Sequence, residues 1–116
     1  MYFSGESALH IAVKGKQSKF IKMLLNYHFI NINLQEKRDK NTPLHIACFN
    51  GSNETIALLL KAKANTEISN KRKKLPIDLC ETEETKKIIR EYVQSQTKES
   101  SLGKLFKLNL DVLYVL

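Results

Sequence analysis

The sequence predicts an all-α solenoid, in which stacked helix–turn–helix units alternate with projecting hairpin loops. Apolar residues recur at helical spacing in short paired segments, and the whole pattern repeats at offsets of 35 and 33 residues, with Leu9, Leu44 and Ile77 as anchors. A single short helix pair cannot bury its apolar face alone. We therefore expect the units to stack and to share one elongated core.

The first unit is expected to hold two short helices separated near Gly15. Leu9, Ala12 and Val13 stand at i, i+3 and i+4, which is the spacing of one helical face. A second stripe of the same kind follows the break and consists of Phe20, Ile21, Leu24 and Leu25. Both segments are short, so packing between units must stabilise them.

The second unit repeats this pattern with a break at Asn50-Gly51. Its two stripes are Leu44, Ala47 and Cys48, followed by Ile56, Leu59 and Leu60. Pro43 stands where a first helical turn begins, a position that tolerates the missing N–H. Ser52 or Asn53, ahead of Glu54, is expected to cap the second helix.

The third unit keeps the register less completely. Leu75 to Cys80 aligns at an offset of 33, with Pro76 at the first turn, and the same offset places Ile88-Ile89 and Tyr92-Val93 in the slots of the second helix. Thr82 is its expected cap, with Glu83 in the first turn. We therefore expect two short helices here as well.

The domain is expected to span residues 1–94, in repeats of about 5–37, 38–70 and 71–94, and the polar stretches within 34–41 and 69–74 are expected to form the loops. Residues 95–116 are expected to form a C-terminal tail. From Leu102 to Leu116 the apolar pattern fits a helix and a strand equally well. This tail is either a cap or partner-binding segment, or the end of a truncated or alternatively spliced product.

The motif Thr42-Pro43-Leu44-His45-Ile46-Ala47, followed by Asn50-Gly51, Ile56 and Leu58-Leu59-Leu60, closely resembles the ankyrin repeat. The resemblance covers roughly residues 5–94, and the third repeat is degenerate. It implies that His10 and His45 are structural groups that hydrogen-bond the hairpin backbone. It also implies that binding surfaces lie on hairpin tips and first helices, without a cofactor.

Several residues depart from the ankyrin pattern at positions where glycine is usual. Lys16 occupies the glycine slot of the first inter-helix turn, with Gly15 one place early, so this turn is expected to differ from its counterpart. His28 and Lys63 replace the glycine that ends the second helix in a left-handed conformation, and Lys40 and Lys73 replace the glycine at the hairpin tips. Two extra residues between His28 and Thr42 predict a longer or bulged first hairpin loop.

The composition is that of an ordinary globular domain, with 116 residues, 42% hydrophobic, 27% charged and a formal net charge of +7. Cys48 and Cys80 are too few for a disulfide framework and lack zinc-site spacing, and their small-residue slots predict packing roles. The N-terminus does not resemble a signal peptide, and no apolar stretch is long enough to span a membrane. We expect an intracellular monomer, in the cytoplasm or nucleus.

Nothing in the sequence predicts catalysis. No nucleophile–base pair, phosphate loop or metal cluster is recognisable, and Glu81, Glu83 and Glu84 are explained by the positive end of a helix dipole. The prediction is a non-enzyme with no metal and no cofactor.

Carrying over the slots that vary in the ankyrin family, we expect this chain to bind another protein with an acidic surface, and Phe49 is the expected hot spot. The candidate partner-binding residues are Glu6, Lys14, Tyr27, Arg38, Asp39, Asn41, Phe49, Asn50, Lys71, Arg72, Lys74, Thr82 and Glu83. Two alternatives stay open. The basic run Lys71 to Lys74 fits nucleic-acid binding or nuclear targeting, with nucleic acid the less favoured partner, and the chain could be a regulatory fragment of a larger ankyrin-repeat protein.

Overall fold

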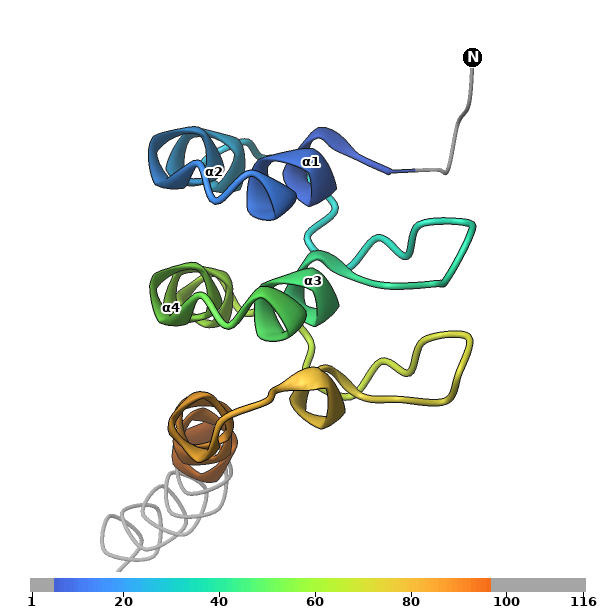
Figure 1. Cartoon of the computed structure of the whole chain (residues 1–116). Helices are drawn as coiled ribbons and strands as arrows, with labels where there is room; N and C mark the ends of the chain where they lie inside the picture. The colour runs from blue at the N-terminus through green and yellow to red at the C-terminus, as the bar shows by residue number, and fades with distance from the viewer. Residues whose placement is uncertain (1–5, 97–116) are drawn as a thin grey trace, which may run out of the picture.

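The computed structural model describes residues 6–96, which form stacked helical layers with two loops projecting from one side (Figure 1). The elements are α1 (Ala8–Lys14), α2 (Ser18–Leu25), α3 (Pro43–Asn50), α4 (Asn53–Lys61) and the 3₁₀ helix η1 (Pro76–Leu79). Residues 83–96 are also helical. No β-strand occurs within 6–96, so the predicted all-α solenoid is confirmed.

The first helices of the repeats form one column and the second helices another (Figure 1). α1 packs against α2 and α3, and α3 in turn packs against α4 and η1. Leu9 and Leu44 are fully buried at matching places in successive layers, and Ile77 is half-buried against the same core. The repeats therefore share one elongated core, as predicted.

The first helices begin with a reciprocal cap. The Thr42 side-chain oxygen accepts the His45 backbone N–H, while His45 Nδ1 accepts the Thr42 backbone N–H at 3.0 Å. Ser7 and His10 repeat this arrangement at the start of α1. The predicted caps of the second helices are also present, because Ser52 and Thr82 accept the backbone N–H groups of Thr55 and Thr85.

The third repeat lacks the full first helix that the sequence pattern predicted. η1 is a single turn, and Cys80 leaves it in an extended conformation with φ −73° and ψ 128°. At its start, Asp78 Oδ2 accepts the Leu75 backbone N–H at 2.9 Å, in place of the motif histidine. The chain then extends to Thr82, whose hydroxyl caps the next helix, so no residues remain for a second turn.

This shortening also corrects the predicted slots of the last helix. The helix begins at residue 83, which is 30 residues after the start of α4 at Asn53, instead of the predicted 33. The Thr82–Thr85 hydroxyl contact of 2.7 Å matches the Ser52–Thr55 contact of 2.9 Å. Thr85 therefore occupies the Thr55 slot, and Ile89 occupies the slot of Leu59.

Lysine adopts the left-handed backbone conformation at four positions, Lys16, Lys40, Lys63 and Lys73, with φ between 53° and 68°. The prediction that the Lys16 turn would differ is wrong, because Lys16 donates to Val13 O just as Gly51 donates to Cys48 O. The prediction for His28 is also wrong, since its φ is not positive. A turn in which the Ile30 N–H donates to Tyr27 O follows α2 instead.

The two extra residues of the first repeat fall in separate places. One lies in the turn after α2, because the Asn31 and Asn65 side chains, 34 residues apart, accept equivalent backbone N–H groups at 3.1 and 2.8 Å. The other lies at the loop tip, where Lys40 donates to Glu36 O, four residues back, but Lys73 donates to Asn70 O, three back. The prediction of a longer first loop is therefore confirmed, since its tip is one residue longer than the tip of the second loop.

Lys16→Gly is expected to raise the free energy of unfolding by about 0.5–1 kcal/mol, because glycine adopts the left-handed conformation without the side-chain clash that lysine pays. A Cβ built at the equivalent Gly51 meets no atom within 4 Å, so space is not the constraint. Urea unfolding measures the change. Lys22→Gly in the interior of α2 is the matched control and should lower stability by about 1 kcal/mol. If Lys16→Gly destabilised the protein, the left-handed conformation assigned to Lys16 would be contradicted.

Within residues 6–96, no helix is long and apolar enough to cross a membrane. The predicted tail was residues 95–116, of which residues 95 and 96 continue the last helix. The two readings of Leu102 to Leu116, like the rest of the tail, concern residues outside the described part of the chain.

Candidate functional site

A groove of about 500 Å³ runs between the projecting loops and the column of first helices. We call the loop tips finger 1 (residues 36–41) and finger 2 (residues 70–74). Many of the predicted partner-binding residues line this groove: Glu6, Lys14, Arg38, Asp39, Asn41, Phe49, Asn50 and Arg72. Side chains from all three repeats therefore meet at one surface.

The remaining candidates lie apart from the groove lining. Lys71 and Lys74 belong to finger 2, and Tyr27 follows α2 with 67% of its surface exposed. Thr82 caps the last helix, and Glu83 forms ion pairs with Lys86 at 3.6 Å and Arg90 at 3.1 Å. The hydrogen bond from Arg90 lowers the pKa of the Glu83 carboxyl, and the charges of Lys86 and Arg90 lower it further.

Phe49 is the large apolar side chain that the groove exposes. It lies in α3 directly after the fully buried Cys48, yet 65% of its surface is accessible. Ile46, one helical turn earlier, and Leu79 from η1 line the same groove, while the Asn50 amide donates to Val13 O at 3.4 Å and ties α3 to α1. A rigid helix thus presents an aromatic ring over an aliphatic floor.

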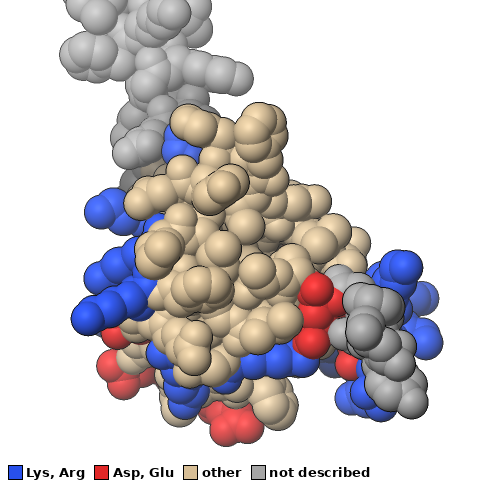
Figure 2. All heavy atoms as spheres, turned by 90° about the horizontal axis from the view of Figure 1, so that it is seen from above, with Lys and Arg blue, Asp and Glu red and all other residues tan. Residues whose placement is uncertain are grey.

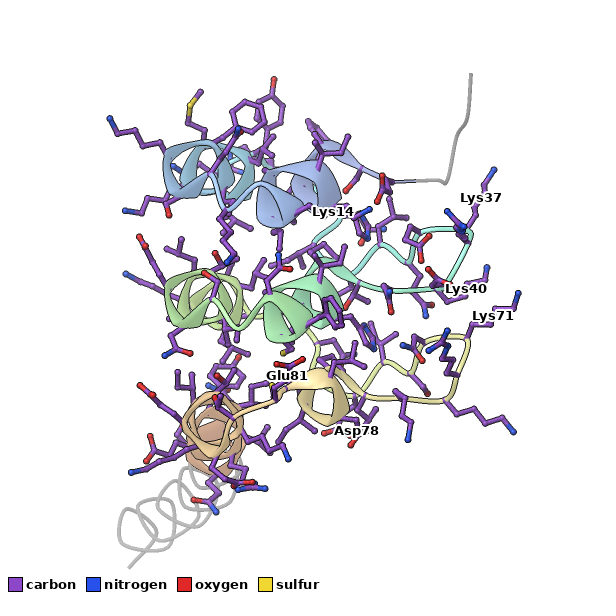
Figure 3. All side chains as sticks on the ribbon, in the orientation of Figure 1. Lys14, Lys37, Lys40, Lys71, Asp78 and Glu81 are labelled. Carbon is purple, nitrogen blue, oxygen red and sulfur yellow. The ribbon has the colours of Figure 1, made fainter. Side chains whose placement is uncertain are left out.

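The upper rim of the groove is internally paired. Lys14 points from α1 toward the layer of α3 and forms an ion pair with Glu6 (Figure 3). Each of these residues was predicted as a separate contact. Their pairing neutralises both charges, so a partner that uses either one must first displace the other.

The finger tips, in contrast, carry basic side chains without a recorded acidic partner. Lys37, Lys40 and Lys71 extend outward from the tips (Figure 3), and Arg38, Arg72, Lys73 and Lys74 share the same two fingers. None of the ion pairs within 4 Å found in residues 6–96 involves these side chains. Asp39 is the acidic residue among them with an exposed side chain, so the fingers present a positive surface to solvent.

Finger 1 is held in shape by Glu36, a groove residue that the sequence analysis missed. Its carboxylate accepts the backbone N–H groups of Arg38 at 2.8 Å, Asp39 at 2.7 Å and Asn41 at 3.0 Å, and only 5% of the residue is exposed. Burial by itself would raise the pKa of Glu36, but these donors outweigh burial and the net pKa is lowered. A lone carboxylate in a polar loop carries no sequence signal for this role.

The fingers are anchored to the helices by two buried histidines. His10 Nε2 contacts Asn41 O and His45 Nε2 contacts Lys74 O, each at 2.9 Å. This confirms the structural role that the ankyrin resemblance implied. Sequence analysis did not foresee that His45, with Ile46, Asn70 and Leu79, would also line the groove.

The two fingers are also bonded to each other. The Lys71 backbone N–H donates to Asp39 O at 2.9 Å, and the Asn70 amide donates to the Asn41 side-chain oxygen at 3.0 Å. Gln35 bridges the carbonyls of Lys40 and Ser69 at 3.0 and 2.9 Å. The basic side chains therefore project from a cross-linked backbone.

The predicted packing role of the two cysteines is confirmed. Cys48 and Cys80 are unpaired and buried, and burial raises the pKa of both thiols, which keeps them protonated and unreactive at neutral pH. Among the described residues, no group of three or more histidine, cysteine or acidic side chains is placed to hold a metal ion.

A family model and a solved structure both match this chain as ankyrin repeats. The family model for ankyrin repeats (3 copies) matches residues 2–72. The ankyrin domain of Osh1 from Kluyveromyces lactis superposes with a TM-score of 0.75 at 26% identity, covering 81% of this chain and 40% of that one.

Similar sequences occur in larger proteins of different kinds. The human transient receptor potential cation channel subfamily A member 1 is 39% identical over 75 residues, which is 65% of this chain and 7% of the relative. Palmitoyltransferase ZDHHC17 of Danio rerio is 39% identical over 59 residues, which is 51% of this chain and 9% of the relative. The chain thus spans less than a tenth of the length of either relative. With its matched model, its repeated caps and its stacked layers, the chain belongs to the ankyrin-repeat family.

Proposed function

We propose that this chain is a non-catalytic protein-interaction module that binds an acidic, partly apolar peptide segment in the groove between the fingers and the first helices. Ankyrin repeats generally act in protein–protein interaction, which sets the class of function. The observation that carries the finer proposal is the exposed Phe49 ring, which lies in a groove flanked by the basic fingers.

Phe49 supplies the apolar anchor. An aromatic ring that is exposed in the free protein, on a helix fixed by packing and caps, loses little conformational entropy when a partner covers it. Ile46 and Leu79 beside it offer a floor for an aliphatic side chain of the partner. We therefore expect the partner segment to place an apolar residue against Phe49.

The fingers supply charge complementarity. Arg38 and Arg72 line the groove itself, and the neighbouring lysines surround them at the tips. Such a basic rim accelerates encounter with an acidic segment more than it adds to final affinity. Acidic residues on either side of the apolar anchor would complement the two fingers.

Phe49→Ala is expected to weaken binding by at least about thirtyfold, because truncating a central aromatic anchor commonly costs about 2 kcal/mol or more. Peptides selected from a random display library on the full chain serve as probes, and fluorescence polarisation measures their dissociation constants. Lys14→Ala should change affinity by less than about threefold, since Lys14 is already paired with Glu6. Lys87→Ala, on the last helix and 3.9 Å from Glu91, is the control outside the groove.

Equal effects of Phe49→Ala and Lys14→Ala would contradict a groove centred on Phe49. The competing function is nucleic-acid binding by the fingers alone, and a salt titration against generic DNA and RNA separates the two. Phosphate contacts would give a steep loss of affinity with salt that Phe49→Ala leaves unchanged. Such a result would replace the peptide proposal.

A further inference from the structure

The two ends of this solenoid differ in chemistry. In the second repeat, Ile56 and Leu60 are buried in α4. The last helix, which starts 30 residues later, has Lys86 and Arg90 in these slots, and both side chains pair with Glu83. A terminal repeat with a charged outer face keeps a solenoid from exposing apolar surface. The last described helix therefore has the charged face that a capping repeat has.

The N-terminal end has the opposite character. Four large apolar side chains of α1, α2 and the residues after α2 are exposed by 60%, 44%, 65% and 67%: Ile11, Phe20, Met23 and Tyr27. Their equivalents in the second repeat, 35 residues later, are buried or half-buried: Ile46, Thr55, Leu58 and Ala62. The same slots are thus covered in one repeat and open in the other.

These slots face the preceding repeat. Thr85, the third-repeat equivalent of Thr55 and Phe20, donates to the Asn53 side chain of the second repeat at 3.2 Å. Ile46 likewise borders the groove shared with Lys14 of the first repeat. Ile11, Phe20 and Met23 therefore occupy positions that, elsewhere in this chain, pack against the layer above.

Viewed from above, the middle of the N-terminal end is a broad face without charged side chains, and both basic and acidic side chains are found at its margins (Figure 2). Residues 7–35 contain Lys14, Lys16, Lys19 and Lys22 but no acidic residue. Glu6 neutralises Lys14, and the other charged residues of this range are all lysines, so two copies that met through this face would bring like charges together. This disfavours self-association here.

We propose that the N-terminal end is a stacking surface for one further helix–turn–helix repeat, whose underside is aliphatic like that of the first repeat. The argument is continuity with the interface already present between the first and second repeats. There, the buried Ala12 and Val13 of α1 lie in the layer above Ile46. A repeat of the same kind, placed one layer higher, would cover Ile11, Phe20 and Met23 in the same way.

The test is a tandem duplication in the full chain, with a second copy of residues 7–41 inserted between Glu6 and Ser7. This length equals the 35-residue offset between the first two repeats, so the added repeat enters in register. Because each new interface adds to solenoid stability, the urea midpoint is expected to rise by about 1 M or more. A midpoint that stays unchanged or falls would overturn the proposal.

Met23→Lys shows whether the higher urea midpoint comes from stacking on this face or only from the added helices. In the unmodified chain, where Met23 is exposed, the substitution should shift the midpoint by less than about 0.2 M. In the duplicated chain, the original copy of Met23 lies beneath the added repeat. There, Met23→Lys should remove most of the rise in the urea midpoint. Equal small shifts in both backgrounds would contradict burial of the face. Sedimentation of the unmodified chain gives a further check, because a dimer that Met23→Lys dissociates would assign this face to a second copy instead.

Discussion

Leu59→Ala is expected to lower the free energy of unfolding by about 3–5 kcal/mol, which is most of the stability of a domain this small. Leu59 lies in α4 of the middle repeat and is fully buried in the shared core. Truncation would leave a cavity between α4 and the layers on both sides. Because neighbouring repeats stabilise each other through these interfaces, the loss spreads to the whole stack. Chemical denaturation followed by circular dichroism measures it.

Met23→Ala is the matched control for Leu59→Ala. Met23 lies in α2 with 65% of its surface exposed, so the same kind of truncation should cost less than about 0.5 kcal/mol. If Leu59→Ala cost no more than Met23→Ala, the shared core described above would be incorrect.

His45→Phe is expected to cost about 2–4 kcal/mol although it keeps an aromatic ring of similar size in the core. The substitution leaves the buried Thr42 backbone N–H unsatisfied, which costs about 1–3 kcal/mol. It also removes the imidazole bond to the Lys74 carbonyl, which keeps its bond from the Asn70 N–H, and a lost hydrogen bond costs about 1 kcal/mol more. It would also free finger 2 from α3. Amide hydrogen exchange at finger 2 should therefore accelerate more than the lower global free energy of unfolding explains.

The same histidine should make stability depend on pH. Burial lowers the pKa of His45, outweighing the hydrogen bond to Lys74 O and the charge of Asp78, which raise it. Nδ1 of His45 accepts the Thr42 N–H, so protonation of Nδ1 would place its N–H opposite the Thr42 N–H, with no acceptor between the two donors. A lowered pKa means that the unfolded chain binds the proton more readily. The stabilisation is therefore present above pH 6.5 and is lost as the pH falls below it.

Denaturation midpoints of the natural chain and His45→Phe between pH 7.5 and 5 isolate this contribution. The difference between the two proteins should shrink as the pH falls, because only the natural chain loses the neutral-imidazole contribution. His28→Phe, the same substitution at an exposed position, serves as the control. A constant difference across this range would exclude titration of His45.

The repeat register, the two helical columns, the caps at Ser52 and Thr82 and the exposed Phe49 could all be predicted from the sequence. The register of the first two repeats, the columns and the caps follow from apolar spacing within one helix or from a cap residue adjacent to it, so local residue order is sufficient. The exposed Phe49 was expected from the ankyrin resemblance, which marks its slot as one on the surface. The basic fingers are equally local, because their charges lie in consecutive runs. The ankyrin resemblance added the roles of His10 and His45, which spacing alone would not distinguish from catalytic or ligand histidines.

The third repeat and the ends of the groove depended on tertiary structure. The Thr82 hydroxyl caps the last helix three residues earlier than the repeat register predicted, and the residues left for the first helix form a single turn. Lys14 and Glu6 are eight residues apart, yet they meet because α1 turns one toward the other. Sequence patterns record the order of side chains along each element but not these contacts.

The sequence by itself determined what each repeat is made of: helices with one apolar face, capped ends and charged loops. Only the tertiary structure decided which side chains share the groove, that Glu36 orders finger 1, and that the N-terminal end is apolar while the C-terminal end is charged. The physical reason is that helix periodicity depends on neighbours three or four residues away. Burial and pairing depend instead on the layer that packs above or below, about one repeat away in sequence.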